Sequence, residues 1–301
     1  MPEMRTFFEL SPRNSDLKIM QRMNELDPLV QWGFEQINGS LELCNKSHRI
    51  ESVIHTLKLA ARFPNIKISG FNLLISVPGD SAENIIVMRD NLWLLRYIFA
   101  ALSSQKQMLQ FRPLQIDVSE GIPFGKQIDF SSSWMRENLR RTLWVNRYSS
   151  VIGDEEKAID FGATLQLTPF PDTSLTRDTY TSVIEAFSAT IGNHSIRVYD
   201  DPEGRSVIAM TDESTTTEYT VPEEDHAVLV ETASPRKLKD LESSFGGRPG
   251  STLAEVFGRL TAHGLIWLDP KRRICINTLP PQVQDTLDLK LMSDGAPRGT
   301  G

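Results

Sequence analysis

The stretch from Ser69 to Ser81, SGFNLLISVPGDS, is where residue types and spacing first point to chemistry. Its apolar residues alternate, so that Phe71 and Leu73 point to one side of a strand and Asn72 points to the other. Pro78-Gly79-Asp80 then ends the strand, and a helix follows. Proteins with parallel strands keep their chemistry at the carboxyl ends of those strands. We therefore expect a ligand site at this end of the strand.

The sequence offers no recognisable set of metal or disulfide ligands. Its two cysteines, Cys44 and Cys275, lie far apart, which is no disulfide framework and indicates a reducing compartment. No CxxxCxxC arrangement occurs, so the chain cannot supply the thiolates of an iron–sulfur cluster. The five histidines never show HExxH or HxH spacing. We therefore expect no metal-binding residues.

Composition limits the class of protein. A chain of 301 residues that is 40% hydrophobic and 24% charged favours two domains with cores of their own. The net charge of −7 argues against a general nucleic-acid binder. No apolar run is long enough to cross a membrane, and the N-terminus has no signal-peptide pattern. We expect a cytoplasmic protein that does not bind membranes.

The elements that would position the site alternate between strand and helix. The predicted strands cover residues 4–10, 29–37, 69–77 and 108–118, and the predicted helices cover 11–26, 46–62 and 82–104. This order implies parallel βα units with right-handed crossovers. The predicted fold is therefore α/β, with a partial (β/α) barrel over residues 1–128. Because the first strand begins almost at Met1, we expect a missing N-terminal portion or a partner chain beside it.

The second half predicts a different architecture. Residues 129–193 are expected to be a helical connecting region, with helices over 132–152 and 176–191. A hairpin turning at DPEGR, a third strand TTTEYTV, three helices and a hairpin over 264–279 then predict an α+β winged-helix-like domain at 194–286. The expected helix caps are Thr220 with Glu223, Ser234 with Pro235, and Thr252 with Glu255. Residues 287–301 are expected to be a disordered tail.

Five segments, in order along residues 4–128, resemble the strand-end motifs of radical SAM enzymes: FFELSPR, VQWGFEQINGSLE, NKSHRI, ISGFNLLISVPGD and FRPLQIDVSEGIPF. The family they resemble is the cobalamin-type radical SAM family that matures ribosomally made peptides. In that family a cobalamin domain precedes the barrel, and a CxxxCxxC loop holds a 4Fe-4S cluster. This chain lacks that loop and the family's GGE motif.

The resemblance implies a site for S-adenosylmethionine across the carboxyl ends of the strands. Glu9 or Glu35 would accept hydrogen bonds from the methionyl amine, and Arg13 would hold the methionyl carboxylate. Asn38 and Asn72 would bond the ribose hydroxyls.

The same resemblance places the backbone of Pro78 and Gly79 against the adenine, because glycine has no Cβ. Gln115 and Asp117 would face the ligand or the substrate from the fourth strand.

Each of these residues has a structural alternative. Glu9 and Glu35 could cap helices or pair with basic neighbours such as Arg13. Asn38-Gly39 could be a turn, and Pro78-Gly79-Asp80 could be a strand stop followed by a helix cap. Asp117 could be a salt-bridged surface residue.

Without cluster ligands, the chain alone is not expected to cleave S-adenosylmethionine. A fragment or one half of a split enzyme explains this best. The alternative is a non-catalytic partner that binds a precursor peptide as an added strand, with the hairpin at 195–211 as the docking surface. A winged-helix DNA-binding protein ranks below both, because the helix at 251–263 carries few basic residues.

Overall fold

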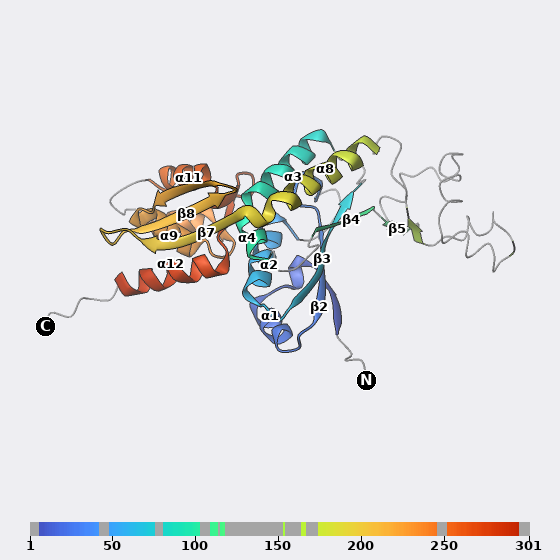
Figure 1. Ribbon diagram of the computed structural model, residues 1–301, viewed down its shortest axis with the longest axis horizontal. Helices are drawn as coiled ribbons and strands as arrows, with labels where there is room; N and C mark the ends of the chain where they lie inside the picture. The colour runs from blue at the N-terminus through green and yellow to red at the C-terminus, as the bar shows by residue number, and fades with distance from the viewer. Residues whose placement is uncertain are drawn as a thin grey trace.

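The computed structural model describes residues 6–41, 48–75, 81–102, 109–113, 115–117, 153, 164–166, 174–245 and 252–294. The chain is a mixed α/β protein with two hydrophobic cores. One core lies in the N-terminal half beneath a parallel sheet, and the other lies among the C-terminal sheets and helices (Figure 1). No helix among the described residues is long and apolar enough to cross a membrane.

The N-terminal half contains a four-stranded parallel sheet. Its strands are β1 (Phe7–Leu10), β2 (Leu29–Glu35), β3 (Lys67–Ile75) and β4 (Leu109–Pro113), in the order β1-β2-β3-β4. Helices α1 (Leu17–Asn24), α2 (Ile50–Arg62), α3 (Ala82–Leu94) and α4 (Arg96–Ala101) lie between them in sequence. Each connection joins two strands that are adjacent in the sheet and crosses over with the same handedness, so these helices lie on one side of the sheet (Figure 1). The predicted βα order is confirmed, but the described strands form no closed barrel.

The predicted fourth strand is two separate strands, which corrects the expectation for residues 108–118. β4 pairs with β3, whereas β5 (Gln115–Asp117) pairs antiparallel with β6 (Thr164–Gln166). Pro113 is the last residue of β4 paired with β3, and as a proline it has no N–H to donate to a sheet ladder.

Two predicted helices also differ from the structure. The first begins at Leu17 because the side chain of Asp16 caps it by accepting from the backbone N–H of Ile19 at 2.9 Å. The residues before it form a 3-10 turn, η1 (Pro12–Asn14). The long helix predicted over 82–104 breaks at Leu95, which separates α3 from α4.

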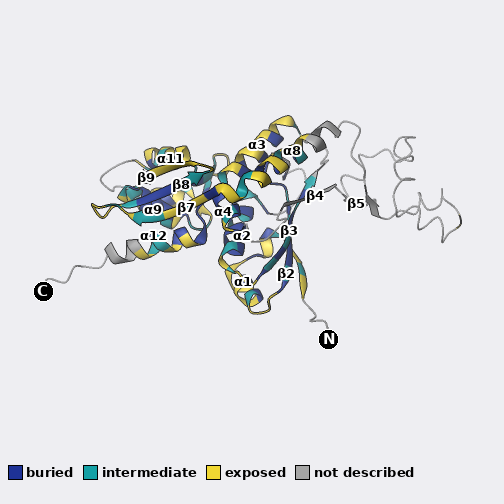
Figure 2. Cartoon of the chain, in the orientation of Figure 1, coloured by how far each residue is buried: buried dark blue, intermediate teal, exposed yellow. Residues whose placement is uncertain are grey.

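Aromatic side chains hold the parallel sheet against its helices. Phe34 and Phe71 stack with ring centroids 4.7 Å apart, and Trp32 lies 5.5 Å from Phe71. The buried residues of α2 that meet them, Val53, Ile54 and Leu57, recur at the spacing that the sequence predicted. Figure 2 shows β2 and β3 largely buried, while α3 and α8 expose their outer faces.

Helix α8 (Ser174–Thr190) completes the first core. Its buried residues Tyr180, Ile184 and Phe187 are spaced as one helix face, and Phe187 packs edge-on to Phe99 of α4 at 5.5 Å. The helix predicted over 176–191 is therefore confirmed. The helix predicted over 132–152 lies outside the described residues.

The C-terminal half begins with an antiparallel sheet of β7 (His194–Asp200), β8 (Ser206–Asp212) and β9 (Thr215–Thr220), as predicted. Three helices and a second antiparallel sheet follow. They are α9 (Glu223–Glu231), β10 (Arg236–Lys237), α10 (Leu238–Phe245), α11 (Leu253–Ala262), β11 (Ile266–Asp269) and β12 (Ile274–Asn277), with sheet order β10-β12-β11.

One of the three predicted caps forms. Thr252 and Glu255 make a reciprocal capping box at the start of α11. Thr220 does not cap α9, whose cap residue is Pro222, and Ser234-Pro235 does not start α10, because the next residues pair with β12. Helix α12 (Pro281–Asp294) extends well into the segment that was expected to be a disordered tail.

Polar contacts fasten the two halves together. The Nζ of Lys58 on α2 donates to the Ala233 carbonyl at 2.9 Å and to Oδ1 of Asn277 at 2.5 Å. The guanidinium of Arg96 on α4 bonds both carboxylate oxygens of Asp212 on β8, with Nε–Oδ1 at 2.5 Å and Nη2–Oδ2 at 2.9 Å. The Tyr97 hydroxyl donates to the same carboxylate, at 3.1 Å from each oxygen.

Candidate functional site

The face of the parallel sheet that points away from the helices is the candidate site. Along β2, Val30, Trp32 and Phe34 enter the hydrophobic core. Strand alternation therefore turns Gln31 and Gly33 to the opposite face. The carboxylate of Glu35 lies on that face too, because a Cβ added to Gly33 would lie 3.1 Å from its Oε1. We call this opposite side of β1, β2 and β3 the open face. Apart from Gln31, whose side chain is buried, it is less buried than the core side, and it carries Glu9, Glu35 and Asn72 beside the apolar Phe7 and Leu74.

Strand pairing brings two predicted residues, Glu9 and Asn72, onto this open face. Glu9 of β1 pairs with Gln31 of β2, and Gly33 of β2 pairs with Asn72 of β3. Glu9 is exposed, and Glu35 and Asn72 are half-buried. The alternation predicted for Phe71, Asn72 and Leu73 holds, because the two apolar residues are buried in the core.

Glu35 ends β2 in an unusual conformation. Its φ is +61°, in the left-handed region that non-glycine residues rarely adopt. Its carboxylate lies back toward Gly33, where an added Cβ would approach Glu35 Oε1 to 3.1 Å. Backbone strain of this kind clusters at functional sites. The conformation turns a carboxylate over the open face.

Gln31 is a residue of the open face that the sequence did not single out. It is 6% exposed, and its Nε2 has no hydrogen-bond partner among the described residues. A buried polar atom without a partner costs free energy unless something bonds it. Gln31 therefore supplies a donor beside Glu9. The alternation in LVQWGFE is the signal that could have revealed it.

Arg13 lies beside the open face in sequence but its side chain is exposed. It belongs to η1, which directly follows β1. An exposed guanidinium near the carboxyl ends of the strands can reach an anionic group there.

Asn38 does not share this exposure. It is 1% exposed, and its Nδ2 donates to the Asn84 carbonyl and to the Tyr180 hydroxyl, both at 2.9 Å. These bonds tie the end of β2 to α3 and α8.

Four other predicted residues are placed differently or not described. Pro78 and Gly79 lie outside the described residues. Gln115 and Asp117 lie on β5, which pairs with β6, so the expectation that they belong to the fourth parallel strand is wrong. The reason is the break at Pro113, which separates them from the sheet.

The described residues contain no group of three or more side chains suited to holding a metal ion. Cys275 is buried, and burial raises the pKa of its thiol to about 12, so the thiolate is disfavoured. Cys44 lies outside the described residues. A cluster that needs three thiolates does not fit a chain with two cysteines.

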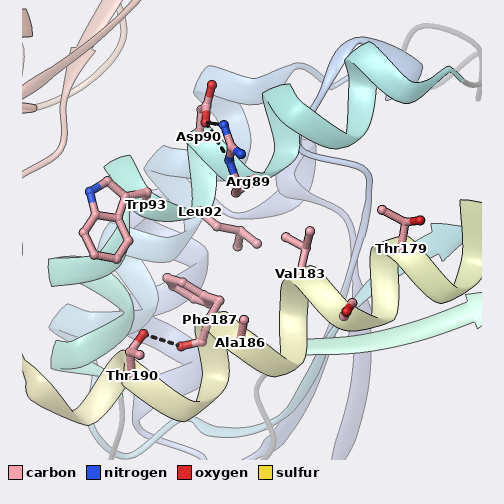
Figure 3. A pocket seen from close by; sticks show the side chains of 10 residues that line it. Arg89, Asp90, Leu92, Trp93, Thr179, Val183, Ala186, Phe187 and Thr190 are labelled. Atoms are coloured by element: carbon pink, nitrogen blue, oxygen red, sulfur yellow. Dashed lines mark hydrogen bonds and ion pairs between the residues drawn. The ribbon is translucent and has the colours of Figure 1, made fainter.

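Apart from the open face, a groove of about 720 Å³ lies between α3 and α8 (Figure 3). Its walls are largely apolar, with Leu92, Val183 and Phe187 inside. Arg89 and Asp90 at its edge bond each other at 2.9 Å. This groove offers mainly hydrophobic contact, and its two charged residues are paired with each other.

No protein-family model matches the sequence, and no curated protein matches it. Among solved structures the chain is weakly similar to coproporphyrinogen III oxidase from Escherichia coli, described as a radical SAM enzyme. The TM-score is 0.34 at 9% identity, over 97% of this chain and 70% of that chain. A TM-score of this size does not establish a shared fold.

Proposed function

We propose that this chain is part of a radical SAM protein and binds S-adenosylmethionine on the open face. One observation carries the proposal. The open face gathers Glu9, Glu35 and Asn72 from three neighbouring parallel strands, close to the carboxyl ends of β1 and β2. Ligands of parallel α/β proteins bind at these strand ends. The resemblance of the five sequence segments to radical SAM motifs is the reason for proposing S-adenosylmethionine as the ligand.

The charges of the open face complement the methionyl end of the ligand. Glu9 and Glu35 offer carboxylate oxygens to the ammonium group, and Arg13 offers a guanidinium to the carboxylate. Asn72 and the Nε2 of Gln31, which has no hydrogen-bond partner among the described residues, supply hydrogen bonds for ribose hydroxyls. Asn38 has a reduced part in the proposal, since its amide is already bonded.

S-adenosylmethionine supplies a sulfonium that breaks down to a radical when an electron reaches it. The two cysteines of this chain do not fit the cluster that delivers the electron. We therefore propose a chain that holds the ligand and works with a catalytic partner or a further segment in the maturation of a ribosomally made peptide. We assign no residue to cobalamin.

Isothermal titration of the full chain with S-adenosylmethionine tests the proposal. We expect saturable binding, and we expect Glu35→Gln and Glu9→Gln each to weaken it by about tenfold, which corresponds to 1.4 kcal/mol. Glu25→Gln, an exposed residue just after α1, is the matched control and should leave affinity unchanged. Binding that is absent, or equal in all variants, contradicts the proposal.

A second candidate function is recognition of a precursor peptide, proposed here at the edge of β9 in place of the hairpin at 195–211, which forms β7 and β8. β9 lies at the edge of its sheet and pairs only with β8 among the described residues, and five of its six residues are exposed. An exposed edge can accept an extended peptide as an added strand. We propose that this edge belongs to the winged-helix-like domain, for which the order α9-β10-α10-α11-β11-β12 is the support.

The same region is less suited to DNA. Arg259 of α11 is held by the buried carboxylate of Asp225, with Nε–Oδ2 at 3.1 Å.

Fluorescence titration with a labelled peptide of a precursor leader sequence tests the peptide hypothesis. We expect saturable binding, and we expect Thr217→Pro in β9 to weaken it. Such a loss would support docking at this edge, because proline cannot pair in a sheet ladder. Binding unaffected by this change would contradict it.

A further inference from the structure

A cavity lined by both charged and apolar side chains lies where the two halves of the molecule meet. Its volume is about 480 Å³. Its walls are formed by Asn38 and the 3-10 turn η2 (Gly39–Leu41), the amino-terminal end of α2, one side of α3, and β11 with the turn that follows it. None of the strand residues of the open face lines it, and the one shared residue, Asn38, has only a reduced part in the function proposed above, so the cavity does not depend on that function. We infer that this cavity binds a free α-amino acid with an apolar side chain.

Glu51 is the residue that points to a ligand. It lines the cavity and is 6% exposed. Its Oε1 accepts from Nη1 of Arg272 at 2.6 Å, but its buried Oε2 has no partner among the described residues. A buried carboxylate oxygen without a donor is costly. An ammonium group in the cavity would satisfy it.

The rest of the polar lining favours a negative group. Arg49, Lys271 and Arg272 outnumber the two acidic residues, Glu51 and Asp269, and the Glu51 charge is already paired with Arg272. The amino-terminal end of α2 adds partial positive charge. The turn that carries Lys271 is fixed, because Asp269 Oδ1 accepts from the N–H groups of Lys271 at 2.9 Å and Arg272 at 3.0 Å.

A single small ligand satisfies both requirements when it carries an ammonium and a carboxylate on neighbouring atoms. That is the chemistry of an α-amino acid. The apolar part of the wall, formed by Ile50, Val87, Trp267 and Leu268, then selects an apolar side chain. Gly39 lets the Asn84 side chain pack against the backbone of this wall, because a Cβ at position 39 would lie only 2.6 Å from Asn84 Oδ1.

Isothermal titration of the full chain with L-leucine tests this inference. We expect saturable one-site binding below about 10 mM. Leucinol, which lacks the carboxylate, and N-acetyl-L-leucine, which lacks the ammonium, should each bind at least tenfold more weakly. No heat with L-leucine overturns the inference, and so does equal binding of leucinol. Inorganic phosphate that binds where L-leucine does not would also overturn it, because the cavity would then be a simple anion site.

Two variants locate the binding. Glu51→Gln keeps an acceptor for Arg272 but removes the charge that faces the ammonium, and should abolish binding of L-leucine. Lys271→Met changes an exposed side chain, so it should leave the unfolding midpoint unchanged while weakening binding about tenfold. Lys18→Met on the exposed side of α1 is the matched control. Binding that survives Lys271→Met and Glu51→Gln unchanged contradicts the inference.

Discussion

Glu35 and Gly33 show at the scale of single residues how β2 presents its end. Glu35 is a glutamate at φ +61°, and its carboxylate takes the space that a side chain at position 33 would need. Left-handed backbone costs a non-glycine residue about 1 kcal/mol or more. A conformation that disfavours folding is expected to be retained for what its side chain does.

Glu35→Gly separates stability from binding. Glycine adopts this backbone without the steric cost, so we expect the free energy of unfolding to rise by about 1 kcal/mol. Binding of S-adenosylmethionine should weaken in the same variant. Urea denaturation with a parallel titration measures both. Glu9→Gly is the control, because Glu9 lies inside a regular strand and its change should lower stability. A destabilised Glu35→Gly protein would refute the account of strain.

At the scale of elements, local signals predicted most of the described fold. The alternation of Asn72 with Phe71 and Leu73 predicted which side of β3 faces the core, and helix periodicity predicted the buried side of α2. Where a prediction failed, contacts between residues distant in sequence determined the structure and overrode the local signal. Ser234-Pro235 has the residues of a helix start, but Arg236 pairs with Cys275 of β12 instead.

The candidate site was also predictable where local sequence patterns determine it, and not where contacts between residues distant in sequence do. Glu9 and Asn72 share a face because strands alternate and pair, whereas Glu35 reaches that face across an irregularity in the pairing of β2 with β3. The burial of Asn38 depends on Tyr180, 142 residues later in the sequence, so local sequence could not reveal it. The φ of Glu35 carries no sequence signal either, because glutamate is not a residue that favours it.

The capping box of α11 gives a prediction at the element scale. Thr252→Ala removes the side chain that accepts from the Glu255 N–H, and should cost about 1 kcal/mol in the free energy of unfolding. Thr220→Ala is the matched control, because Thr220 makes no cap and its change should cost much less. Thermal or urea denaturation of the two variants compares them. Equal losses would show that the box does not stabilise α11.

At the scale of the whole molecule, Lys58 links the two halves from a buried position. Burial, helped by the nearby Arg62 charge, lowers the pKa of Lys58 from 10.5 to about 7, against the opposing effects of Asp288 and Asp285. Its hydrogen bonds to Ala233 and Asn277 hold α2 against the C-terminal half.

This buried lysine makes stability depend on pH. Between about pH 7 and 10.5 the unfolded chain carries a proton on Lys58 that the folded chain lacks, so the free energy of unfolding rises with pH in that window. Below about pH 7 both states carry the proton and the contribution is constant.

Lys58→Met should remove this rise. We therefore expect the variant to lose stability relative to the natural protein as the pH increases from 7 to 9.5, by about 1 to 3 kcal/mol at 1.36 kcal/mol for each pKa unit. Urea denaturation at several pH values measures it, with Lys18→Met on the exposed side of α1 as the control. A difference between Lys58→Met and the natural protein that does not change with pH would contradict the prediction.

The central claim is that S-adenosylmethionine binds at the strand ends of the open face. Hydrogen exchange of the full chain, with and without saturating S-adenosylmethionine, tests it most directly. The account predicts slower exchange in the backbone of residues 10–15 and 34–37, which follow β1 and β2, with no change around Glu51 and Arg272. Unchanged exchange in both segments, or protection confined to the cavity at Glu51, would contradict it.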